Sequence, residues 1–194
     1  MQLKRLFSTS ACKNTFGYID SQRKYEIIRT VIYFGISLSL FIAGYVATKS
    51  KTNLLTVVAV LGCLPASKSL VSAVMFLKHH SCSKAVYDSV EKFTEGLESL
   101  YDLVFTSEKV TYVVDHAAYH AKCLVLYTEN KVDVNSLETH IQEYMKRANI
   151  LGVNVKVYTD LKKYAERLQQ LSALEREDFR LSQEVVQLLK QITL

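Results

Sequence analysis

Two long runs of apolar residues stand out in the first 80 positions of the chain. From Thr30 to Thr48 no residue carries a charge, and as a helix this run would cross roughly 28 Å of hydrocarbon. A second run, from Asn53 to Leu77, contains one charge, Lys68. Because only the stretch TKSKT separates the two runs, they predict an antiparallel transmembrane helical hairpin over residues 30–78.

The pattern changes after the second run and predicts an α/β domain over residues 79–194. A helical period begins after Cys82 and runs through Val86, Val90, Phe93, Leu97 and Leu100. The elements expected after it are strands at 101–106, 110–114 and 121–128, a helix at about 135–149, a strand at 153–158 and mostly helix over 161–192. This αβββαβα order predicts a four-stranded, mainly antiparallel sheet covered by helices.

Basic residues are concentrated in the first part of the chain. Residues 1–78 carry a net charge of +8 and the remainder −3, within an overall +5. Lysine and arginine beside apolar runs are typical of segments that meet anionic lipid headgroups, so the lipid bilayer is the expected partner. A nucleic-acid-binding protein would carry its basic excess on the folded domain, so no nucleic acid is favoured as a partner.

The positions of the lysines and arginines predict the orientation of the hairpin. Residues 1–29 form a basic arm, and Lys78 and Lys84 follow the second run, whereas Lys49 and Lys51 lie in the turn. We therefore expect a multi-pass protein of the cell inner (cytoplasmic) membrane with both termini in the cytoplasm. The acid-free start MQLKRLFSTSACKNTF is also similar to a mitochondrial presequence, which makes the mitochondrial inner membrane the alternative location.

Small residues recur every four positions along both apolar runs. They are Gly35, Ser39, Ala43 and Ala47 in the first run and Ala59, Cys63 and Ser67 in the second. Such faces let helix backbones approach closely in lipid. One interpretation is that the two faces pack the hairpin on itself, and the other is that one of them holds a second copy or a partner protein.

Lys68 is an ionisable residue inside an apolar run and has two interpretations. Its position near the cytoplasmic end of the span favours a side chain that extends to the headgroups. The alternative is a place on the path of a small transporter or channel subunit.

Chemical signatures are sparse. The chain contains no P-loop, GxGxxG, HExxH, GxSxG or CxxC pair, and the sequence predicts no cofactor. His116 and His120 are candidate zinc ligands, although we expect them in a turn between strands, where their spacing guarantees no shared face.

The αβββαβ order resembles the core of PD-(D/E)xK nucleases, and Asp115 with Glu129-Asn130-Lys131 matches the loose motif of that family. The resemblance implies a metal-dependent nuclease. We expect Asp115 and Glu129 to lie a full strand apart, roughly 15 to 20 Å, at opposite ends of a hairpin. Glu108, Glu129 and Lys131 are therefore the candidate catalytic residues.

A second resemblance covers most of the chain. The segments NLLTVVAVLGCLPASKSLVSAVMF, YDLVFTS and KYAERLQQLSALE are similar to a family of uncharacterised small two-helix membrane proteins from Gram-positive anaerobic bacteria. Some members carry an O-GlcNAc-transferase-like label, but about 115 soluble residues are too few for a glycosyltransferase fold. The resemblance implies a membrane setting and no mechanism.

These observations favour a membrane-anchored, non-enzymatic module that binds a protein partner or itself. The contact surfaces would be the small-residue faces of the hairpin or the apolar side of the last helix, which comprises Leu181, Val185, Leu188 and Ile192. The alternatives are the membrane-tethered nuclease and the transporter or channel subunit.

Overall fold

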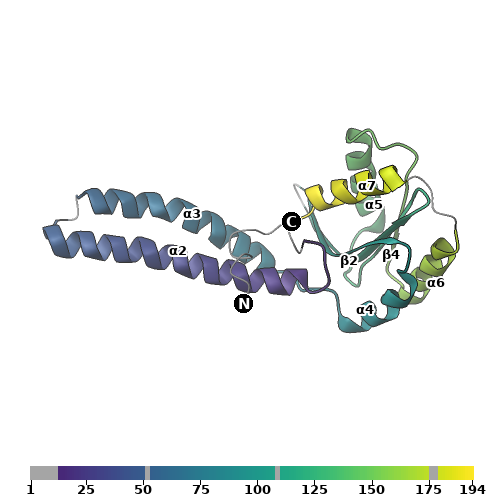
Figure 1. Ribbon diagram of the computed structural model, residues 1–194, viewed down its shortest axis with the longest axis horizontal. Coiled ribbons are helices and arrows are strands. Elements are labelled where there is room, and N and C mark those ends of the chain that lie inside the picture. The colour runs from purple at the N-terminus through teal and green to yellow at the C-terminus, as the bar shows by residue number, and fades with distance from the viewer. Residues whose placement is uncertain (1–12, 51–52, 108–109, 175–178) are drawn as a thin grey trace. The chain divides into compact units, whose positions relative to one another are not determined.

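The computed structural model describes residues 13–50, 53–107, 110–174 and 179–194 (Figure 1). The chain forms two compact units. One contains Ile19–His80, and the other contains Ser81–Leu194 together with the residues just before the first long helix. Most of the presequence-like start, residues 1–12, lies outside the described residues.

The first unit is an antiparallel helix pair, α2 (Tyr18–Thr48) and α3 (Leu54–Leu77), whose helices lie side by side (Figure 1). Both are long and apolar enough to cross a membrane. Asn53 caps α3, and its side chain accepts a hydrogen bond from the Thr56 N–H at 2.8 Å. The predicted hairpin is therefore present.

Helix α2 begins twelve positions earlier than the apolar run predicted, so residues 18–29 of the expected arm are helical. Two ion pairs at i,i+3 spacing support this part of the helix: Asp20 with Arg23 at 3.2 Å and Glu26 with Arg29 at 2.9 Å. Hydropathy alone missed this segment because it is polar.

The interface between α2 and α3 is built from small side chains. A Cβ atom at Gly44 would lie 2.7 Å from the Asn53 Oδ1, and one at Gly62 would lie 2.7 Å from the Ser37 Oγ. Farther along, the Thr30 and Ser69 hydroxyls are 2.9 Å apart. These close approaches are the kind of packing that joins helices in lipid.

The second unit is an α/β domain with a mixed sheet of strand order β1-β2-β3-β4. Strands β1, β2 and β3 form an antiparallel meander, and β4 is parallel to β3. This confirms the α/β fold class, the helix and strand order, and the mainly antiparallel sheet. The elements are α4 (Lys84–Val90), η2 (Glu91–Phe93), β1 (Glu98–Thr106), β2 (Thr111–His120), β3 (Cys123–Tyr127), α5 (Val134–Arg147), β4 (Asn154–Tyr158), α6 (Leu161–Ser172) and α7 (Phe179–Ile192).

Helices cover both faces of this sheet (Figure 1). Helices α5 and α7 pack on one face, and α4 and α6 pack on the other. Val185 and Leu189 of α7 are buried in the first of these cores, with Leu181, Leu188 and Ile192 partly buried beside them. The apolar side of α7 therefore packs on its own domain, and a partner contact through residues 181–192 stays a prediction.

Two boundaries differ from the sequence prediction. The helix after Cys82 ends at Val90 and is followed by the short 3-10 helix η2; the chain then passes through Gly96 at φ 87°, and Leu100 belongs to β1. Strand β2 continues to His120 instead of ending at Val114. It reaches that length because a two-residue turn, with Ala121 and Lys122 both at positive φ, joins it directly to β3.

The outer edge of β1 is covered by both ends of the described chain. The Asn14 carbonyl accepts the Tyr101 N–H at 2.9 Å, and the Leu194 N–H donates to the Val104 carbonyl at 3.1 Å. The Lys13 Nζ also donates to the Thr193 carbonyl at 2.6 Å. On the opposite edge, the Glu138 carboxylate accepts the Val157 N–H of β4 at 2.8 Å.

Candidate functional site

Two buried carboxylates lie on neighbouring strands of the meander. The register pairs Tyr101 with His116 and Leu103 with Val114, so Asp102 on β1 is opposite Asp115 on β2. Their exposed fractions are 1% and 5%. Buried acids of this kind mark a candidate site because desolvation perturbs their chemistry.

Each acid of this pair holds a backbone N–H group of a different segment. The Asp102 Oδ1 accepts the Cys82 N–H, and the Asp115 Oδ2 accepts the Glu129 N–H, both at 2.7 Å. Asp102 has φ 55°, a left-handed conformation that aspartate tolerates better than most residues. The pair thus fixes the segment before α4 and the loop after β3.

Burial dominates the electrostatics of this region. Burial, assisted by the neighbouring carboxylates of Glu129 and Asp102 and opposed by backbone hydrogen bonds, raises the pKa of Asp115 to about 6. Burial, followed by the nearby carboxylates of Asp115, Asp102 and Glu129, raises the pKa of the Cys82 thiol to about 12. Cys82 is therefore a protonated thiol near neutral pH, a form that is a poor nucleophile.

His116 and His120 lie on β2, not in the predicted turn. Because they are four residues apart in a strand, their backbones are separated by roughly 13 Å, too far to share a zinc ion. The His116 Nδ1 is 2.6 Å from the Tyr164 hydroxyl, and the His120 Nε2–H donates to the Leu174 carbonyl at 3.1 Å. Burial lowers the pKa of His116 to about 3, so it is a neutral core residue.

The expected separation of Asp115 and Glu129 is wrong. Because β2 extends past Val114, Asp115 lies within the strand and hydrogen-bonds the backbone of Glu129. The position opposite Asp115 is nevertheless Thr128, whose hydroxyl donates to the Val113 carbonyl at 2.8 Å. On the β3 side, Thr128 and not Glu129 therefore faces Asp115.

The candidate catalytic residues are not gathered into a metal site. Glu129 and Lys131 are exposed beyond the end of β3, and Glu108 lies outside the described residues. Within the part of the chain that the structure describes, no three His, Cys, Asp or Glu side chains are placed to hold a metal ion.

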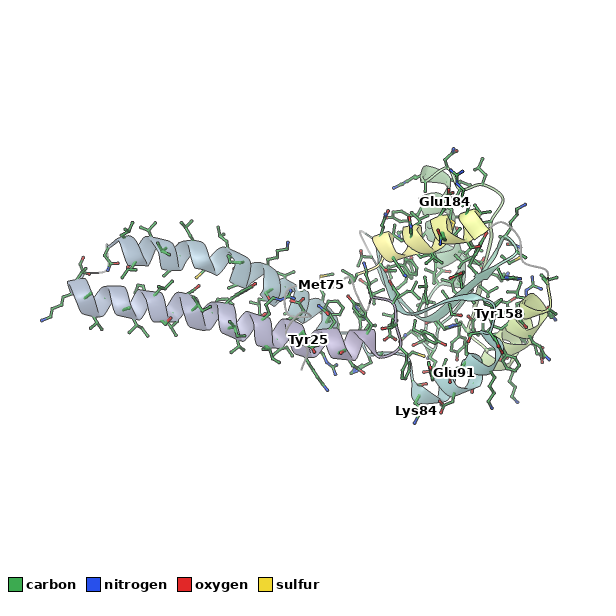
Figure 2. All side chains as sticks on the ribbon, in the orientation of Figure 1. Tyr25, Met75, Lys84, Glu91, Tyr158 and Glu184 are labelled. Carbon is green, nitrogen blue, oxygen red and sulfur yellow. The ribbon has the colours of Figure 1, made fainter. Side chains whose placement is uncertain are left out.

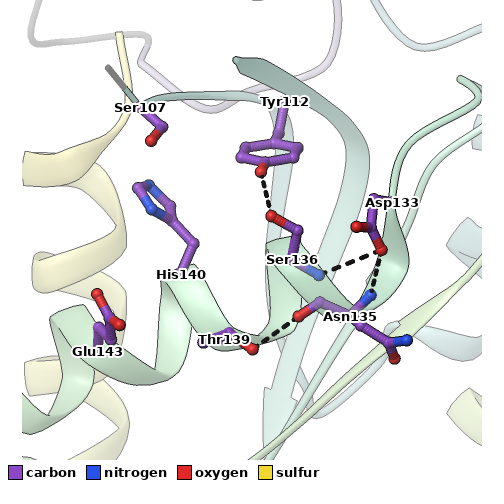
Figure 3. A pocket seen from close by; sticks show the side chains of 8 residues that line it. All are labelled: Ser107, Tyr112, Asp133, Asn135, Ser136, Thr139, His140 and Glu143. Carbon is purple, nitrogen blue, oxygen red and sulfur yellow. Dashed lines mark hydrogen bonds between the residues drawn. The ribbon is translucent and has the colours of Figure 1, made fainter. Parts of the chain in front are cut away.

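A shallow polar pocket of about 350 Å³ lies at the start of α5 (Figure 3). Its polar groups serve mainly to hold the helix. The Asp133 Oδ1 accepts the backbone N–H groups of Asn135 and Ser136, and the Tyr112 and Ser136 hydroxyls are 2.7 Å apart. The remaining lining residues are Ser107, Thr139, His140 and Glu143.

The small-residue face predicted on the first helix does not join α2 to α3. Gly35, Ser39, Ala43 and Ala47 are all exposed, and a Cβ atom at Gly35 would meet nothing within 4 Å. Of the corresponding set on α3, Ala59 is buried, Cys63 is half-buried and Ser67 is exposed. The first of these sets, Gly35, Ser39, Ala43 and Ala47, is named the outer stripe below.

A buried polar network joins the two helices and was missed by sequence reasoning. Glu26 has an exposed fraction of 4%, and its carboxylate accepts hydrogen bonds from Gln22 at 2.9 Å, Arg29 at 2.9 Å and Ser69 at 3.3 Å. The spacing of Gln22, Glu26 and Thr30, four residues apart on one helix face, was the available signal.

Comparison of the chain with protein-family models, curated proteins and solved structures found no match.

Proposed function

We propose that this protein is a membrane-anchored, non-enzymatic interaction module of the cell inner membrane. The α2–α3 hairpin spans the bilayer, and the α/β unit lies on the cytoplasmic side, where the basic flanks of the hairpin also remain. The hairpin associates with a second copy of the chain through the outer stripe.

One observation carries this proposal: among the described residues, the large apolar side chains that are exposed lie on α2 and α3, apart from Phe16, Val110, Leu151 and Leu174. Figure 2 shows these side chains projecting outward along both helices. Only 17% of the apolar window of each helix is buried, whereas the core helix of a soluble protein is mostly buried. Apolar surface of this extent favours a lipid environment.

The non-enzymatic part of the proposal is supported by the buried acids. Asp102 and Asp115 bind backbone N–H groups, Thr128 faces Asp115, and the Cys82 thiol is protonated. These groups hold segments of the domain in place and present no pair of reactive side chains toward a substrate.

The self-association is tested by disulfide cross-linking of the full chain in membranes. In a background without the native cysteines, Ala43→Cys on the outer stripe should cross-link readily between copies. Tyr45→Cys is the matched control, because it is exposed but two residues away on a helix, about 200° around the axis. Equal yields at both positions, or no cross-link at Ala43→Cys, would contradict the proposed contact.

A further inference from the structure

We propose that Arg29 and Lys68 together bind the phosphate group of one anionic phospholipid. This inference depends on the proposed membrane location of the hairpin. It assigns a specific ligand to Lys68, for which the sequence suggested either an unspecified headgroup contact or a place on a transport path.

The contacts between the helices fix which residues lie at the same level. Thr30 faces Ser69, Ser37 faces Gly62, and Gly44 contacts Leu55. The antiparallel pairing is therefore regular along the hairpin. Arg29 precedes Thr30 by one position, and Lys68 precedes Ser69 by one. Because the helices are antiparallel, these steps run in opposite directions, so the positions of Arg29 and Lys68 along the hairpin axis differ by about 3 Å.

Arg29 and Lys68 also point to the same side of the hairpin. The residue before Thr30 and the residue before Ser69 each point about 100° away from the interface, measured around their own helix axis. Because the helices are antiparallel, the two rotations bring both side chains to one side of the helix pair. The pairing of the helices therefore places two basic residues, Arg29 and Lys68, on one side of the helix pair.

The charged groups around Arg29 and Lys68 have a net positive charge that one anion can neutralise. Glu26 accepts a hydrogen bond from the Arg29 Nη1 at 2.9 Å, while the Arg29 Nε is buried without a hydrogen-bond partner. Lys68 is exposed, and none of the carboxylates in the described residues forms an ion pair with it. One carboxylate against two cations gives a net charge of +1, which a phosphodiester neutralises.

The surroundings suit a lipid better than a free phosphate. Leu64 and Val71 are exposed by 68% and 61%, and they lie on the same face of α3 as Lys68 at i−4 and i+3. Arg29 is also the last charged residue before the apolar run of α2 begins at Thr30. Acyl chains thus have apolar helix surface directly beside the two cations.

The test measures lipid binding by the full chain in nanodiscs of phosphatidylcholine with and without phosphatidylglycerol, followed by native mass spectrometry. The unmodified chain should retain phosphatidylglycerol preferentially. Lys68→Gln should weaken this retention about fivefold, as expected for one lysine near the membrane surface. Lys24→Gln, at an exposed site nearer the start of α2, removes the same charge and should leave retention almost unchanged.

Three outcomes would overturn the site. They are equal losses in the two variants, equal retention of the two lipids, and displacement of the lipid by inorganic phosphate. Arg29→Gln is unsuitable alone because it leaves Glu26 unpaired, so Arg29 is tested as Glu26→Gln/Arg29→Gln, which should also lose the preference. Failure of the chain to remain in membranes after alkaline carbonate extraction would instead contradict the proposed function.

Discussion

The hairpin and the α/β unit distribute polar and apolar side chains in opposite ways. In the hairpin, Glu26 and Ser69 are buried between the helices while Leu64 is exposed. In the α/β unit, Leu103 and Leu126 are fully buried in the sheet. This is the distribution expected if, as proposed, water surrounds the α/β unit and hydrocarbon surrounds most of the hairpin.

Buried polar groups also serve different purposes in the two units. The Glu26 carboxylate hydrogen-bonds Ser69 on the other helix, so it joins two elements that no hydrophobic effect would hold together in lipid. Asp102 and Asp115 bind backbone N–H groups in a unit whose apolar cores already hold it together. Polar contacts therefore help to hold the hairpin together but only position segments of the α/β unit.

The largest expected difference comes from the same substitution made in both units. Leu126→Ala should lower the free energy of unfolding of the α/β unit by about 2 to 5 kcal/mol, because it leaves a cavity in the sheet core. Leu64→Ala, on the exposed side of α3, should leave the thermal stability of the full chain in detergent micelles almost unchanged. A large loss for Leu64→Ala would indicate that this face packs against protein and not lipid.

The glycines of α2 provide a test of the interface within the hairpin. Gly44→Leu should destabilise the helix pair by about 1 to 3 kcal/mol, because its Cβ would lie 2.8 Å from that of Leu55. Gly35→Leu is the control and should leave the pairing of α2 with α3 intact. Proximity of the two helices can be followed by cross-linking within one chain, and similar effects of both variants would contradict the packing described.

A smaller effect is expected from the acid pair of the α/β unit. Burial raises the pKa of Asp115 from 3.8 to about 6, so the folded state binds the proton more tightly than the unfolded state. Asp115 therefore contributes stability that is complete below its unfolded pKa and is lost as the pH rises through about 6. Lowering the pH from 7 to 5 should stabilise the unmodified unit by about 1 kcal/mol relative to Asp115→Asn.

His116 acts in the opposite direction and must be separated from this effect. Its pKa is lowered to about 3, so the folded state resists a proton that the unfolded chain accepts below about 6.5. The His116 contribution is the same in both proteins and cancels in the difference. Identical pH profiles of the free energy of unfolding, measured by tyrosine fluorescence, would show that Asp115 does not titrate as described.

The smallest effect is expected at Lys68. Lys68→Leu should insert normally and reach the usual abundance, because an exposed lysine near the headgroups contributes little to insertion beyond its charge. Lys68→Asp should be less abundant, since the shorter acid reaches the headgroups less well. If Lys68→Leu abolished a cellular function at unchanged abundance and unchanged lipid binding, the transport hypothesis would gain support.

Regular features of the fold were predictable from the sequence. The two apolar runs gave the hairpin, and the order of helices and strands gave the mixed sheet. The length of β2 was not predictable, because its extension depends on the turn at Ala121 and Lys122, which adopts positive φ without a glycine. That one difference moved Asp115 from the end of a strand to a position beside Glu129.

The packing face of the first helix was mispredicted for a geometric reason. Residues at a constant spacing of four, such as Gly35, Ser39 and Ala43, drift by about 40° per step around a helix. Within the apolar run, the residues that face α3 are Thr30, Ser37 and Gly44, which are seven apart, and this spacing drifts by only about 20° per step. The constant spacing therefore identified the outer stripe instead of the hairpin interface.

The most direct test of the membrane-anchored arrangement is labelling of single cysteines in intact cells with an impermeant thiol reagent. In a background without the native cysteines, Lys24→Cys and Glu166→Cys should be shielded and Ser50→Cys, in the turn between the helices, should be labelled. All three should react after the membrane is dissolved in detergent. Labelling of Glu166→Cys without labelling of Ser50→Cys in intact cells would contradict the proposed topology.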